Sequence, residues 1–152
     1  TLGTVTTMTV TKLLLTILFL IQLEGPELIV PDSVSARFEA DKLWDKYVLS
    51  GRVNPFYVRG DLDGDGKIDY VVLVKNHSQT EEAVAYVLSS QQRVLVEPRG
   101  TEFDSWEVLD KGTLINRRYG RLKIDSLLMR FRGPGSVRIW NGKTFDVIPW
   151  GD

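Results

Sequence analysis

The chain has 152 residues, of which 43% are hydrophobic and 26% are charged, which suits one globular domain and argues against a disordered or fibrous protein. Lys and Arg total 19 against 20 for Asp and Glu, and this balance argues against nucleic acid or an anionic membrane as the main partner. The sequence contains no Cys, so thiolate catalysis and Cys-based metal sites are excluded.

An apolar run near the N-terminus is typical of an export signal. Lys12 precedes the run LLLTILFLIQL at residues 13–23, and Glu24, Gly25 and Pro26 follow it. The run is shorter than the roughly 20 apolar residues that a transmembrane helix needs. We therefore predict a signal peptide over residues 1–25, with an uncleaved membrane anchor as the alternative. Residues 26–152 would form a single secreted or periplasmic domain that has no membrane contact once the leader is removed.

The first predicted element of that domain is a helix over residues 34–49. Asp32 or Ser33 is a suitable N-cap, and Gly51 is a suitable stop. Apolar residues recur at helical spacing, which predicts one face buried against a sheet; they are Ala36, Ala40, Leu43, Trp44 and Tyr47.

Short β-rich runs fill the rest of the chain. They cover residues 56–60, 70–74, 83–88, 93–97, 106–109, 122–124, 127–132, 137–140 and 145–148. Their close spacing leaves no room for crossover helices, so the strands should pair mostly antiparallel, and Asn141 with Gly142 predicts a type I′ hairpin turn. The predicted fold class is α+β, with one N-terminal helix packed on a mostly antiparallel β-meander.

The sequence DLDGDGKID at residues 61–69 is the segment most indicative of chemistry. Calcium takes six to eight oxygen ligands, and one loop can supply them when side chains at alternate positions turn inward. Two glycines allow the loop to curve tightly. The predicted Ca²⁺ ligands are the carboxylates of Asp61, Asp63, Asp65 and Asp69 with the backbone carbonyl of Lys67.

The segment departs from an EF-hand, because Val72 stands where a bidentate Glu is expected and residues 70–74 predict a strand in place of a helix. It resembles the calcium loops of FG-GAP repeats, as in integrin alpha chains, and of the bacterial VCBS repeats. The resemblance implies a loop that joins two antiparallel strands, with the same five residues as ligands. A complete propeller needs four to eight such units, and this chain has one. A fainter similarity, carried by residues 54–66 and 140–145, is to small exported bacterial proteins of unassigned function.

Three other features of the sequence have simpler interpretations than a second functional site, or offer an alternative to the calcium loop. The loop could be a solvated acidic turn, since Asp and Gly are common in turns. Arg59, Gly60 and Asp61 spell RGD, which we treat as coincidence because Asp61 is the first predicted ligand. His77 is the only histidine, and no nucleophile motif accompanies it, so an unrecognised hydrolase is the weakest alternative.

Arginine and aromatic residues gather in the second half of the chain, and this is the chemistry of protein-binding hot spots. We expect a monomer that acts by binding. The alternative is an inhibitor or immunity-like protein that binds a protein partner outside the cytoplasm, with calcium only structural. The candidate partner-binding residues are Arg130, Arg132, Arg138, Trp140 and Trp150.

Overall fold

A computed structural model describes residues 27–78, 80–98, 103–132 and 135–151, and the predicted leader at residues 1–25 lies outside this part of the chain. The described elements are α2 (Asp32–Ala40), the 3₁₀ helix η1 (Leu43–Asp45), β1 (Tyr47–Leu49), β2 (Tyr57–Gly60), β3 (Asp69–Asn76), β4 (Glu82–Val87), β5 (Leu95–Pro98), β6 (Ser105–Leu109), β7 (Leu114–Asn116), β8 (Gly120–Arg121), β9 (Ser126–Arg130), β10 (Ser136–Trp140) and β11 (Phe145–Pro149). Among them, no helix is long and apolar enough to cross a membrane.

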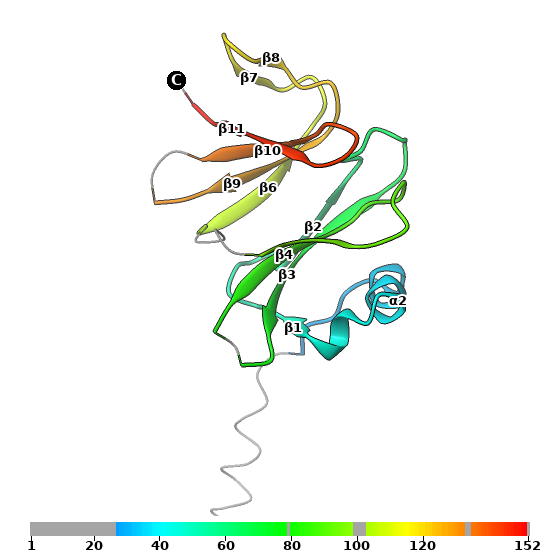
Figure 1. Cartoon of the computed structure of the whole chain (residues 1–152). Coiled ribbons are helices and arrows are strands. Elements are labelled where there is room, and N and C mark those ends of the chain that lie inside the picture. Colours follow the sequence, from blue (N-terminus) through cyan, green and yellow to red (C-terminus); the bar gives the residue numbers. More distant parts are fainter. Residues whose placement is uncertain (1–26, 79, 99–102, 133–134, 152) are drawn as a thin grey trace, which may run out of the picture.

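The described residues form antiparallel β-sheets with one α-helix (Figure 1). Sheet A has the order β1-β3-β4-β5, and β2 pairs with the same edge of β3 as β1 does, closer to the start of β3. Sheet B has the order β11-β10-β9-β6, and β7 and β8 form a separate hairpin between β6 and β9 in the sequence. Every strand pair among the described residues is antiparallel, as predicted.

The two faces of sheet A are covered by different partners. Alternate residues of β3 separate them: Val71 and Leu73 face sheet B, whereas Val72 and Val74 pack in the cluster that includes Val34 and Phe38 of α2. Sheet A is therefore the middle layer, with the helix on one side and sheet B on the other. The far face of sheet B carries a third apolar cluster, in which the β7–β8 hairpin packs through Ile115.

The predicted helix over residues 34–49 is wrong in its second half. α2 ends at Ala40, and Lys42 adopts a left-handed backbone conformation with φ 54°, which cannot continue a right-handed helix. The chain then turns back, so that the ring of Trp44 packs 4.8 Å from that of Phe38. Residues 47–49 pair with β3 as β1, because a β-branched and aromatic segment gains more from sheet pairing than from a helical turn.

The predicted strands are confirmed apart from one segment. They do not form one continuous meander, because they are divided between separate sheets. Residues 122–124 form no strand, and the short strands of the β7–β8 hairpin were not predicted. The predicted pairing of the last two strands is confirmed, with Trp140 opposite Phe145. The turn is not of type I′, because only Gly142 has positive φ, at 96°, and Asn141 instead caps the turn through its side chain.

Candidate metal centre

The acidic segment forms the loop between β2 and β3, as the sequence predicted. Gly60, the last residue of β2, pairs with Asp69, the first residue of β3, so residues 61–68 close the hairpin. Gly64 and Gly66 have φ of +79° and +83°, values that residues with a side chain rarely adopt. The curvature of the loop therefore depends on these two glycines.

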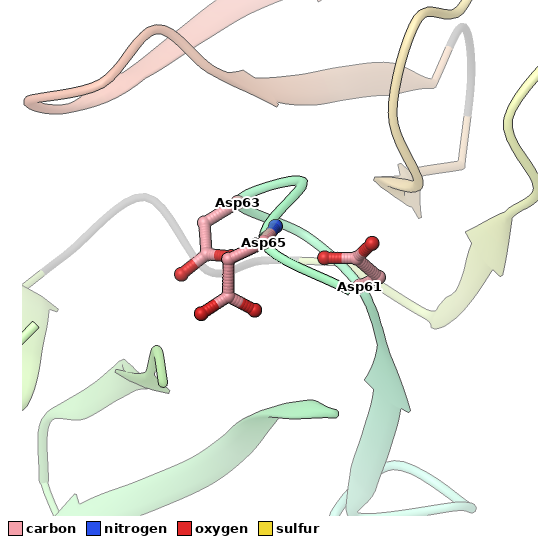
Figure 2. A group of neighbouring side chains, drawn as sticks. All are labelled: Asp61, Asp63 and Asp65. Carbon is pink, nitrogen blue, oxygen red and sulfur yellow. Dashed lines mark hydrogen bonds between the residues drawn. The ribbon is translucent and has the colours of Figure 1, made fainter. Parts of the chain in front are cut away.

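Three carboxylates of the loop converge. Asp61, Asp63 and Asp65 each offer an oxygen, and these atoms lie within 4.8 Å of one another (Figure 2). Each aspartate also accepts a hydrogen bond from a backbone N–H further along the loop: Asp61 Oδ2 from Gly66 at 3.1 Å, Asp63 Oδ1 from Asp65 at 3.1 Å and Asp65 Oδ1 from Lys67 at 2.9 Å. These bonds fix the direction of all three side chains.

One oxygen of this group lacks a partner. Asp61 Oδ1 is buried and is the one such side-chain atom in the described part of the chain that accepts no hydrogen bond. A buried carboxylate oxygen without a donor or cation is costly, because it has lost its water without replacement. The position of Asp61 is therefore compatible with an electropositive neighbour beside Oδ1.

Asp69 lies outside the converging group, although it was a predicted ligand. Its side chain is fully buried, and it accepts backbone hydrogen bonds from Leu62 at 2.8 Å, Asp63 at 3.1 Å and Ser89 at 2.7 Å. Burial raises the pKa of Asp69 above its ordinary value, and the charge of Asp63 acts in the same direction, while the N–H donors oppose them. In this structure Asp69 anchors the start of the loop to the end of β4.

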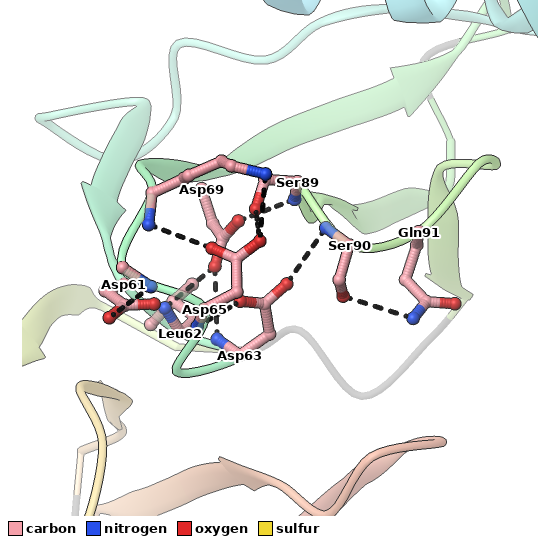
Figure 3. Close-up of polar contacts among 10 residues, drawn as sticks. Asp61, Leu62, Asp63, Asp65, Asp69, Ser89, Ser90 and Gln91 are labelled. Atoms are coloured by element: carbon pink, nitrogen blue, oxygen red, sulfur yellow. Dashed lines mark hydrogen bonds and ion pairs between the residues drawn. The ribbon is translucent and has the colours of Figure 1, made fainter.

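The turn after β4 forms a second side of the site, which was not predicted from the sequence. Ser89 Oγ donates to Asp65 Oδ2 at 2.7 Å, and the Ser90 N–H donates to Asp63 Oδ2 at 3.2 Å (Figure 3). The Ser89 hydroxyl is the main reason that the pKa of Asp65 lies below its ordinary value. The predicted antiparallel pairing of neighbouring strands could have indicated this contact. A strand antiparallel to β3 ends beside the point where β3 begins, which is next to the acidic loop.

The far side of the loop is tied to the segment that precedes β9. Asp125 accepts hydrogen bonds from the Asp61 N–H at 3.0 Å and from the Lys111 N–H at 2.9 Å. Ile124 packs against the loop so closely that a Cβ added to Gly64 would lie 2.7 Å from its Cγ2. The acidic loop is thus held between sheet A and the connections of sheet B.

The donor set suits a hard cation. Each carboxylate oxygen has two lone pairs, so Asp63 and Asp65 can keep their protein hydrogen bonds and still ligate a metal. A group with only oxygen donors and no His fits Ca²⁺ better than a transition metal. The predicted role of the Lys67 carbonyl stays a prediction, and the ammonium of Lys67 lies 3.6 Å from Asp65 Oδ2 at an exposed position.

The five candidate partner-binding residues do not share one exposed face. Arg138 and Trp140 are 5% and 8% exposed, and both point between the sheets. Trp150 packs in the cluster on the far face of sheet B. Arg130 and Arg132 are exposed, and Arg130 pairs with Glu107 across the sheet at 2.7 Å. Successive side chains along a strand point to opposite faces of the sheet, so Arg138 and Trp140, two residues apart on β10, share its inner face.

Arg138 instead belongs to a polar network between the two sheets. Its guanidinium makes two hydrogen bonds of 3.1 Å to Glu97 of β5, and the Tyr86 hydroxyl donates to the same carboxylate at 2.9 Å. Burial raises the pKa of Tyr86 well above its ordinary value, and the Glu97 charge adds to the effect. These contacts join sheet A to sheet B and are structural.

Comparison with family models, with curated proteins and with solved structures found no match to this chain. The resemblance of residues 61–69 to FG-GAP and VCBS loops therefore stays a prediction. By its fold and site, the described part of the chain is an antiparallel β-protein with two main sheets, a β7–β8 hairpin, one covering helix and a cluster of three carboxylates in the β2–β3 loop.

Proposed function

We propose that the chain is a small calcium-binding domain of α+β class that acts outside the cytoplasm as a binding module. One Ca²⁺ binds in the β2–β3 loop and makes it rigid. Asp61, Asp63 and Asp65 supply the side-chain ligands, and the Lys67 carbonyl completes the loop's contribution. The apolar run at residues 13–23 supports a secreted or periplasmic location.

The observation that carries the proposal is the convergence of three carboxylates on a loop in which Asp61 Oδ1 is buried without a donor. Three negative charges within 4.8 Å repel one another, and the loop's backbone donors offset this only in part, because they leave that oxygen without a partner. A divalent cation at this point would offset the repulsion, and Asp61 Oδ1 would become one of its ligands. Magnesium fits less well because it holds its water shell and takes few protein ligands.

Thermal unfolding of the domain in calcium and in chelator tests the proposal. The loop lacks a bidentate Glu, so we expect a Kd of about 10⁻⁴ to 10⁻³ M, as in extracellular calcium modules. At a tenfold excess of calcium over Kd, the linkage relation RT ln(1 + [L]/Kd) gives about 1.4 kcal/mol of added stability. For a domain of this size that is a rise in Tm of about 3 to 6 °C.

Asp65→Ala removes one ligand and should abolish the calcium-dependent rise in Tm. Asp104→Ala removes the same charge at an exposed position outside the loop and should retain the full rise. A wild-type Tm that is the same in chelator and in millimolar calcium would contradict the proposal, and the loop would then be an acidic turn held by its own hydrogen bonds. An equal loss of the shift in both variants would show that the ion acts through net charge and not through this loop.

A further inference from the structure

A cavity opens beside the β7–β8 hairpin and reaches the acidic loop, because Asp63 is among the residues that line it. It has a volume of about 580 Å³ and lies between the β7–β8 hairpin and the far face of sheet B. Its apolar wall is formed by Ile115, Leu122, Ile139 and Ile148. This volume is in the range of roughly 300 to 1,000 Å³ that is usual for small-molecule sites.

Two side-chain hydrogen bonds mark the ends of the hairpin that borders the cavity. Asn116 Nδ2 donates to the Gly151 carbonyl at 3.4 Å, and the Arg121 guanidinium donates to the Gly112 carbonyl at 2.8 Å. A two-stranded hairpin has little stability of its own and depends on what it packs against. Part of its apolar surface faces the cavity, so an apolar ligand there would extend the packing that holds the hairpin.

Four charged residues line the cavity, two acids and two cations. Asp146 is held by a hydrogen bond of 2.8 Å from Asn141, and Asp63 accepts N–H bonds from its own loop and from Ser90. Both acids thus already accept hydrogen bonds within the protein. Arg121 and Lys123, two residues apart along the chain, also line the cavity and are exposed. Arg121 uses one nitrogen on a carbonyl, which leaves its remaining N–H groups for a ligand.

We propose that this cavity binds a small amphipathic acid, with an aliphatic or aromatic body against the isoleucine wall and a carboxylate or similar anion at Arg121 and Lys123. The proposal goes beyond calcium binding: the apolar wall and the two cations lie outside the metal centre, and Asp63 is the residue that the cavity shares with it. An anion at two cations beside an apolar wall gains charge-assisted hydrogen bonds and burial of its body at once.

The test uses three probes that share a ten-carbon chain, namely decanoate, decanol and decylammonium. Binding is titrated by isothermal calorimetry in chelator, with probe concentrations below the onset of micelles, so that no bound calcium contributes to the measured affinity. We expect decanoate to bind at least fivefold more tightly than decanol, and decylammonium to bind most weakly. Equal affinity for decanoate and decylammonium would overturn the proposal.

Matched variants locate the site. Lys123→Glu should weaken decanoate binding at least tenfold, while Arg117→Glu, an equal charge change at an exposed position outside the cavity wall, should change it less than twofold. Ile139→Trp should fill the cavity and abolish binding, and Val147→Trp, at a position 56% exposed on β11, should retain it.

The two exposed charge variants decide the outcome if Ile139→Trp fails to fold. Equal effects of the Lys123 and Arg117 substitutions would place binding elsewhere on the protein and would refute the proposed site. Decanoate binding that survives in a folded Ile139→Trp variant would refute it as well.

Discussion

Substitution of the two loop glycines by alanine separates the two constraints that shape the β2–β3 loop. Gly64 and Gly66 have nearly the same φ, +79° and +83°, so alanine at either position pays the same left-handed backbone cost. A Cβ at Gly66 has nothing within 4 Å, whereas a Cβ at Gly64 would lie 2.7 Å from Ile124 Cγ2. Only Gly64→Ala therefore adds a steric clash.

The expected magnitudes follow from these distances. The left-handed conformation costs an alanine about 1–2 kcal/mol, which is the whole effect expected of Gly66→Ala. A Cβ forced against a packed methyl adds about 1–3 kcal/mol at Gly64. Gly64→Ala should therefore destabilise the domain by about 1–3 kcal/mol more than Gly66→Ala, measured by urea unfolding in chelator so that no metal contributes.

A double variant checks the assigned cause. Ile124→Ala removes the methyl group in question, so Gly64→Ala should cost much less in the Ile124→Ala background than in the wild type. Gly66→Ala should cost the same in both backgrounds. Equal destabilisation by the two glycine substitutions, or no coupling of Gly64 to Ile124, would refute the packing of the loop on the segment before β9.

The polar network between the sheets gives two further predictions. Burial acts to raise the pKa of Glu97, but the hydrogen bonds and charge of Arg138 outweigh it, so its pKa lies below the ordinary 4.5. Stability from this pair is then fully present above about pH 4.5 and is lost as the pH falls through the folded-state pKa, so the gap in unfolding free energy between wild type and Arg138→Met should be wide at pH 7 and narrow at pH 3. Tyr86→Phe removes a hydrogen bond to the same carboxylate and should cost about 1–3 kcal/mol in urea unfolding at pH 7; a loss below 0.5 kcal/mol would show that this bond contributes little.

The sequence predicted local structure well where side-chain alternation or turn chemistry was strong. Tyr70 to Val74 was predicted as a strand from its β-branched residues, and it lies within the central strand β3. The helix was predicted too long because Leu43, Trp44 and Tyr47 keep helical spacing, yet Lys42 breaks the helix and these residues pack on sheet A from a turn and a strand.

The division into two sheets was not predicted. Runs of similar strands do not show which neighbours stay in one sheet, because that depends on contacts between residues far apart in sequence. The contact between Arg138 and Glu97 is one example, since the two residues are 41 positions apart in the sequence and meet between the sheets.

The position of the acidic loop was predicted, and its surroundings were only partly predictable. Alternate aspartates converge as expected, since the spacing itself turns them to one side. Asp69 differs because it already belongs to β3, where its side chain turns inward to backbone donors. Asp125 carried no local signal, because its role depends on a loop from sheet B that approaches the β2–β3 hairpin.

The central claim is tested most directly by following the backbone amides of the loop in ¹⁵N-labelled protein during a calcium titration by NMR. The amides of Gly64 and Gly66 should shift together and saturate at one ion per chain, with a Kd of about 10⁻⁴ to 10⁻³ M. Asp65→Ala should remove both shifts, and amides of the β7–β8 hairpin should move little. Glycine amides that do not shift in millimolar calcium, or shifts confined to other parts of the protein, would contradict a calcium site in this loop.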